Sequence, residues 1–90
     1  MFLEITGSSF LQELIDSKIK SETFTVLPSG KTRVCELILE NGYSVRGEAS
    51  VVDIKNFNQA KGEEISRANA VSKIWQLEGY LLQEKLHNDS

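Results

Sequence analysis

The chain has 90 residues, the size of one small domain and too few for a two-domain enzyme with a cofactor cleft. Hydrophobic residues make up 40% and charged residues 26% of it, a composition typical of globular proteins. The net charge of -3 provides no general attraction to nucleic acid or to an anionic membrane. One Cys and one His exclude an internal disulfide and an all-Cys zinc site, and they leave little material for acid–base chemistry.

The amino-terminal stretch is apolar but short. Residues 1–5 include the acidic Glu4 and lack a basic start, so we expect no signal peptide. No apolar run approaches the roughly 20 residues that span a bilayer. Together with the lone thiol, these features predict a cytoplasmic protein that contacts no membrane.

A first helix is predicted to begin near Ser9. Ser9 and Gln12 have the spacing of a capping box, in which each side chain satisfies a free backbone N–H. Apolar residues at helical spacing then define one stripe, which comprises Phe10, Leu11, Leu14, Ile15 and Ile19.

Three strands are predicted next, over residues 22–27, 32–40 and 43–51. Pro28-Ser29-Gly30 forms the first turn, because Pro presets its own φ and Gly tolerates a positive φ. Asn41-Gly42 marks a hairpin between the second and third strands.

The register of this hairpin follows from its side-chain pattern. A two-residue loop would place Arg46 on the same face as Leu37, whereas a three-residue loop over 40–42 pairs Leu37 with Val45. The longer loop also puts Gly42 in the left-handed conformation that it requires. We therefore expect one apolar face made of Cys35, Leu37, Leu39, Tyr43, Val45, Gly47 and Ala49.

A long helix capped by Asn58 is predicted over about 59–87. An exposed Glu63–Arg67 pair is expected beside its apolar stripe of Ala60, Ile65, Ala68, Val71, Ile74 and Trp75. Unbroken, this helix would be about 43 Å long and would outreach a globule of this size. Two alternatives stay open: the helix bends near Gly79 and folds back, or its end projects and binds another subunit.

The element order predicts an α+β fold. An N-terminal helix precedes a three-stranded antiparallel sheet, and the C-terminal helix packs on one face of that sheet. We expect a single domain over residues 1–90, with residues 87–90 frayed.

Blocks of residues over the last two-thirds of the chain carry a resemblance to a known family. They are Val34-Cys35-Glu36-Leu37, Leu39-Glu40-Asn41-Gly42-Tyr43, Gly47-Glu48-Ala49, Asp53, Asn56-Phe57-Asn58, Gly62, Ala68-Asn69-Ala70, Ile74-Trp75 and Leu77-Glu78-Gly79-Tyr80-Leu81-Leu82. In order and spacing they resemble a family of short tailed-phage and prophage proteins named after gene product forty-nine of one such phage.

The resemblance has two departures, Ile54 and Gln76, which stand where the family commonly has Pro. The Pro that follows the Trp supports a helix break, so Gln76 removes that support. The resemblance implies a phage or prophage source and a setting in the host cytoplasm. It implies no reaction, ligand or catalytic residue.

The residues that could serve in catalysis or metal binding are better explained by structural roles. Cys35 falls on the predicted core face, and the only His, His87, lies in the predicted frayed end. Glu63 and Glu64 are adjacent, so on a helix their side chains diverge by about 100°. We predict no catalytic residue, no metal site and no cofactor, and hence a protein that is not an enzyme.

The terminal helix carries more large apolar residues than one contact face needs. We assign Trp75 to the core and predict an interaction surface of Leu77, Tyr80, Leu81, Leu82 and Leu86. A homodimer formed partly through this helix is the expected use of that surface.

Helix–three strands–helix is also the element order of double-stranded RNA-binding domains. Those domains need positive charge at the start of the last helix, but here Lys61 is followed by Gly62-Glu63-Glu64. The electrostatic footprint of nucleic-acid binding is therefore missing.

The sequence favours a non-enzymatic phage or prophage accessory protein that binds a host protein or a small signalling molecule in the infected cell. The alternatives are a nucleic-acid-associated module with the topology of a double-stranded RNA-binding domain, or a small virion or assembly component. A basic groove would favour nucleic acid, a deep intersubunit pocket a small ligand, and a flat apolar patch a protein partner.

Overall fold

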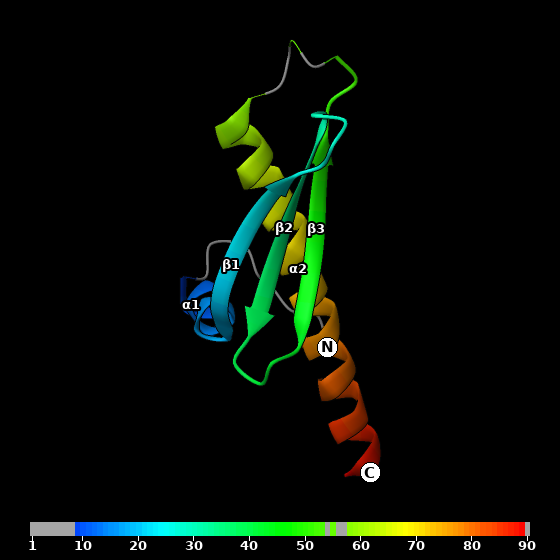
Figure 1. Ribbon diagram of the computed structural model, residues 1–90. Helices are drawn as coiled ribbons and strands as arrows, with labels where there is room; N and C mark the ends of the chain where they lie inside the picture. The colour runs from blue at the N-terminus through cyan, green and yellow to red at the C-terminus, as the bar shows by residue number, and fades with distance from the viewer. Residues whose placement is uncertain (1–8, 54, 56–57, 90) are drawn as a thin grey trace.

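The computed structural model describes residues 9–53, 55 and 58–89, and residues 9–11 by their backbone only. The described part is α+β, as predicted (Figure 1). Its elements follow the order α1 (Ser9–Ser17), β1 (Ile19–Val26), β2 (Thr32–Leu39), β3 (Ser44–Ser50) and α2 (Gln59–Asn88). The predicted capping box of Ser9 and the apolar side chains of Phe10 and Leu11 lie outside the described side chains.

The antiparallel sheet has the strand order β1-β2-β3, and its second hairpin has the predicted register. Leu37 pairs with Val45, and the backbone N–H of Leu39 donates to the carbonyl of Tyr43 at 2.7 Å. Gly42 has a φ of 90°, a conformation that favours glycine, so the three-residue loop is confirmed. The other turn ends at Gly30, whose φ of 76° also agrees with the prediction.

The core lies between one face of the sheet and α2 (Figure 1). It is formed by Ile15, Cys35, Leu37, Leu39, Val45, Ala70, Val71 and Ile74. Tyr43 was expected on this face but is 56% exposed, because it lies at the hairpin end where the sheet stops. Arg33 lies on this face at its other end and is buried, and its Nη1 is 3.3 Å from Oε2 of Glu63 on α2.

The predicted boundary between the first helix and the first strand is wrong. Ile19 is a half-buried residue of β1 rather than part of the helical stripe, and the strand begins three residues before the predicted position. The helix ends at Ser17, whose hydroxyl donates to the carbonyl of Leu14. The carbonyl of Lys18 then accepts a hydrogen bond from Glu40 N–H, so pairing with the hairpin draws this segment into the sheet.

The helix α2 is one continuous element that passes through Gly79, so the fold-back alternative is wrong. Asn58 caps it as predicted, since its Oδ1 accepts from the N–H of Lys61 at 3.0 Å. Thirty residues give a length of about 45 Å, against about 25 Å for the strands. The carboxyl-terminal part of α2 therefore projects past the sheet, as Figure 1 shows. That residues 87–90 fray stays a prediction.

The projection makes the molecule elongated. Its principal extents are 53 × 28 × 20 Å, and its radius of gyration is 15.5 Å, against about 12 Å for a compact domain of this length.

The buried face of α2 differs from the predicted stripe. Ile65 and Ala68 are exposed and Trp75 is half-buried, whereas the buried residues are Ser66, Ala70, Val71 and Ile74. Ala60 is also exposed. Val71 and Ile74 are buried as predicted. Ser66 and Ala70 join them because α2 approaches β3 closely at Gly47, where only small helix side chains fit.

Arg67 does not pair with Glu63, contrary to the prediction. Its Nε donates to Oε2 of Glu22 in β1 at 2.7 Å, and its Nη2 lies 3.5 Å from Oδ1 of Asp16 in α1. The hydrogen bond with Glu22 raises the pKa of Arg67 above its ordinary value. This one side chain therefore joins α1, β1 and α2.

Candidate interaction surface

The five residues predicted to form an interaction surface lie on the carboxyl-terminal part of α2. Tyr80 is 66% exposed, Leu81 60%, Leu82 40% and Leu86 56%, whereas Leu77 packs against the core. The structure thus places four of the five large side chains in solvent. Within the described residues, these make the projecting end of α2 an apolar surface.

The five residues divide between two faces of the helix. Leu77 and Leu81 follow the core residue Ile74 by three and seven positions, so they continue the face that α2 turns toward the sheet. Tyr80 lies beside them, three positions after Leu77. Leu82 and Leu86 instead follow Trp75 by seven and eleven positions and lie on another face. The sequence-based prediction identified these residues but did not divide them between two faces of the helix.

The first group meets the end of the β2–β3 hairpin. A hollow of about 280 Å³ lies between them, lined by Leu39, Asn41, Tyr43, Ile74, Leu77, Glu78, Tyr80 and Leu81. Apart from the buried core residue Ile74, its apolar and aromatic residues are Leu39, Tyr43, Leu77, Tyr80 and Leu81, and we call these five the hairpin–helix surface. Tyr43 was assigned to the core from the sequence. Its place next to the turn, at the end of the alternating face, is the signal that would have assigned it here.

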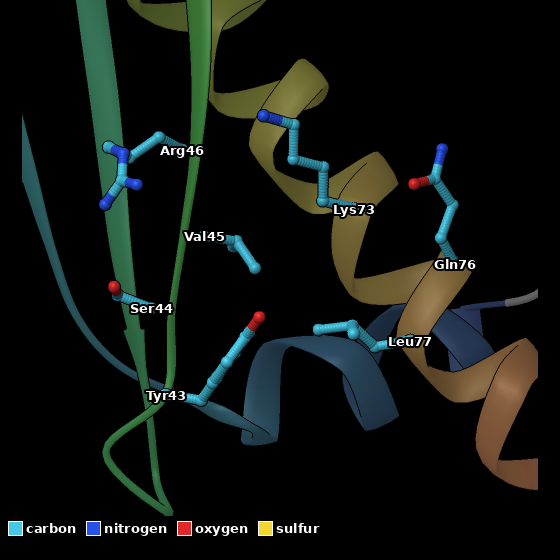
Figure 2. A pocket seen from close by; sticks show the side chains of 7 residues that line it. All are labelled: Tyr43, Ser44, Val45, Arg46, Lys73, Gln76 and Leu77. Atoms are coloured by element: carbon cyan, nitrogen blue, oxygen red, sulfur yellow. The ribbon is translucent and has the colours of Figure 1, made fainter.

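A second hollow of about 340 Å³ adjoins the first along β3 and shares Tyr43 and Leu77 with it. Figure 2 shows the Tyr43 hydroxyl directed into the gap between β3 and α2, with Lys73 and Gln76 on the helix side, whereas the Arg46 side chain points away from α2. On the outer face of the sheet, Nη1 of Arg46 lies 3.4 Å from Oε2 of Glu36. The hairpin–helix surface is therefore apolar and adjoins a hollow whose helix side carries the basic Lys73 and the polar Gln76.

A third hollow of about 420 Å³ lies on the other side of α2, between it and α1. Its lining is mainly from α2 and includes Ala68, Val71, Ser72 and Trp75, with Gln12 from α1. Trp75 packs against the core with one part and contributes another to this hollow, so its assignment to the core was correct only in part.

The residues considered for catalysis are accounted for by their structural surroundings. Cys35 is fully buried, and this burial, together with the charge of Glu22, raises the pKa of its thiol above the ordinary value. Cys35 is therefore the small core residue that was predicted. Glu63 accepts from Arg33, while Glu64 is exposed. Over residues 9–53, 55 and 58–89, His, Cys, Asp and Glu side chains form no group of three that could hold a metal ion.

None of the helices in the described part of the chain has the combination of length and apolar character that crossing a membrane requires. At the start of α2 the exposed Lys61 stands beside Glu63 and Glu64, so the acidic character expected from the sequence is present there.

The fold and this surface define a small α+β protein whose long helix projects past the sheet and carries exposed apolar side chains. The chain matches the phage protein (N4 Gp49/phage Sf6 gene 66) family over residues 10–86, and it belongs to that family. The resemblance found in the sequence is thereby confirmed, and it extends over the first helix as well. No curated protein and no solved structure matches the chain.

Proposed function

We propose that this phage protein acts by binding another protein in the cytoplasm of the infected bacterium, and that the hairpin–helix surface is the contact. The observation that carries the proposal is the exposure of Tyr43, Tyr80 and Leu81, each more than half accessible, around one apolar hollow. Folded proteins that stay monomeric and unbound rarely expose such side chains next to one another, because burying each is worth roughly 1.5–3 kcal/mol.

The composition of the surface favours a protein partner over a small ligand. Two tyrosines supply large rigid contact areas with a hydroxyl at the rim, a combination enriched at energetically dominant interface positions. Asn41 and Glu78 border the same hollow and provide a polar rim. A partner segment with apolar side chains flanked by hydrogen-bonding groups fits this arrangement.

The test compares proteins recovered from infected cells by tagged wild-type protein and by tagged Leu81→Glu and Tyr43→Glu variants. Val52→Glu is the matched control, because Val52 is 95% exposed and lies in the loop after β3, at the opposite end of the sheet (Figure 1). We expect the wild type and the control to recover one host protein in stoichiometric amounts. Both surface variants should fail to recover it. All variants should keep the wild-type circular dichroism spectrum.

Binding is then measured with the purified partner, where we expect Leu81→Glu to weaken affinity at least tenfold. Equal recovery by all variants would contradict the proposal. Recovery of nucleic acid, of a small molecule or of assembled phage particles in place of a host protein would favour the corresponding alternative function.

A further inference from the structure

A second apolar line runs along α2, on a face that does not contact the sheet. Ile65, Ala68, Ser72, Trp75, Gly79, Leu82 and Leu86 are spaced alternately three and four residues apart, which is the spacing of a coiled-coil seam. The α2 residues buried against the sheet are different ones, Ser66, Ala70, Val71 and Ile74. We call the seven residues the outer seam. Except for the half-buried Trp75, all of them are exposed.

We infer that the carboxyl-terminal part of the outer seam, formed by Trp75, Gly79, Leu82 and Leu86, binds the same residues of a second copy of this chain, with the two helices antiparallel and centred between Gly79 and Leu82. In this register Gly79 faces Leu82 of the partner subunit, and Trp75 faces Leu86 of the partner subunit. The two-fold axis repeats both contacts and so gives four layers. In two of them Leu82 packs against the small Gly79, and in the other two Trp75 packs against Leu86.

The flanking residues select this orientation. In an antiparallel pair of helices with this register, the residues just before Gly79 and Leu86 face each other, which places Glu78 opposite Lys85 of the partner subunit, twice by symmetry. The residues just after Trp75 and Leu82 pair Gln76 with Gln83 of the partner subunit. A parallel pair would instead set Glu78 against a glutamine, without an ion pair.

The structure accommodates these contacts. Glu78 contacts Nζ of Lys18 in its own chain through Oε1 at 3.2 Å, and a carboxylate accepts at both oxygens. The antiparallel arrangement carries each globular part past the carboxyl end of the other helix, where α2 projects beyond the sheet (Figure 1). The end of the partner helix then reaches Trp75 and the hollow of about 420 Å³ between α1 and α2.

The outer seam and the hairpin–helix surface lie on different faces of α2, so this inference does not rest on the proposed function. Four layers make a short contact, and we expect a dissociation constant in the micromolar range, as for small interfaces.

The test measures the mass of the full chain by analytical ultracentrifugation over a concentration series. We expect the wild type to reach twice 10.1 kDa. Leu82→Glu should remain at the monomer mass with an unchanged thermal unfolding curve. The matched control is Leu81→Glu, one residue away on the other face, which should dimerise like the wild type. A wild type that stays monomeric at hundreds of micromolar, or a Leu82→Glu variant that dimerises like it, would overturn the inference.

The orientation has its own test. Lys85→Glu places two like charges together and should weaken dimerisation at least fivefold, and the double variant Glu78→Lys with Lys85→Glu should restore it. If the single variant has no effect, or the double variant does not restore dimerisation, the antiparallel register is wrong.

Discussion

Gly47 determines how closely α2 packs on the sheet. A Cβ at this position would overlap the carbonyl oxygen of Ser66 and the amide nitrogen of Ala70, and would lie 2.7 Å from the carbonyl carbon of Asn69. These are backbone atoms of a helix and cannot move separately. We expect Gly47→Ala to lower the free energy of unfolding by about 3 kcal/mol, as measured by urea denaturation.

Gly62→Ala is the control for this prediction. It adds the same methyl group at the same helix–sheet interface, but there the Cβ makes an ordinary 3.5 Å contact with the Arg33 side chain. It should leave stability unchanged or raise it by about 0.5–1 kcal/mol through helix propensity. Equal urea midpoints for the two variants would contradict the packing explanation.

Cys35 fills space in the core. Cys35→Ala should lower the free energy of unfolding by about 1 kcal/mol and retain partner binding. Because the folded-state pKa of the thiol is raised, the native protein should resist iodoacetamide at neutral pH and react once unfolded. Loss of partner binding by a folded Cys35→Ala protein would contradict this role.

The same pKa shift predicts a pH dependence. Above about pH 8.5 the unfolded thiol ionises while the folded thiol stays protonated. Wild-type stability should therefore fall from this pH up to the folded-state pKa, and Cys35→Ala should lack this component of the fall. Urea midpoints of both proteins at pH 7 and above pH 9 measure the difference.

At the scale of elements, the start of α2 depends on its cap. Asn58 has extended backbone angles, and its Oδ1 satisfies the N–H of Lys61, which has no partner within the helix. Asn58→Ala should cost about 1 kcal/mol of stability, whereas Asn58→Ser, which keeps an accepting oxygen, should cost only a few tenths. Equal loss in the two variants, measured by thermal unfolding, would show that the cap contributes little.

The sheet was predictable because strand alternation and turn chemistry are local signals. Shifting the hairpin by one residue would have put Arg46 on the apolar face, so one register satisfied both patterns. The boundary at Ile19 was missed because a hydrogen bond between Lys18 and Glu40, distant in sequence, draws the segment into the sheet. Such tertiary pairing overrides local periodicity.

The core face of α2 was missed for a different reason. Hydrophobicity selects large residues such as Ile65, whereas contact with Gly47 demands small ones such as Ser66 and Ala70. The large residues left over still carry information. Once Ser66 and Ala70 are placed against the sheet, Ile65, Ala68 and Trp75 align with Leu82 and Leu86 as the outer seam. The residues of the candidate surface were thus recoverable from the sequence, but their division into two faces required the helix orientation.

At the scale of the whole molecule, a single long helix exceeds the sheet on which it packs. The sheet packs against the amino-terminal part of α2. The projecting part presents the hairpin–helix surface on one side and the outer seam on the other. Side chains that would stabilise a core if the helix folded back are thereby left exposed, which connects the elongated shape with the proposed binding role.

The whole molecule also shares its order of elements with double-stranded RNA-binding domains, and its charge argues against that use. The net charge is -3, and at the start of α2, where those domains contact phosphates, the exposed Lys61 is followed by Glu63 and Glu64. Each phosphate contact needs a basic group that displaces a counterion, so the affinity that such contacts supply is missing here. We expect no gel shift of duplex RNA or DNA below about 100 µM protein at physiological salt, where even non-specific binders have dissociation constants of about 1–100 µM. Binding at about 1 µM or tighter, with an affinity that falls steeply as salt rises, would contradict this prediction and restore the nucleic-acid alternative.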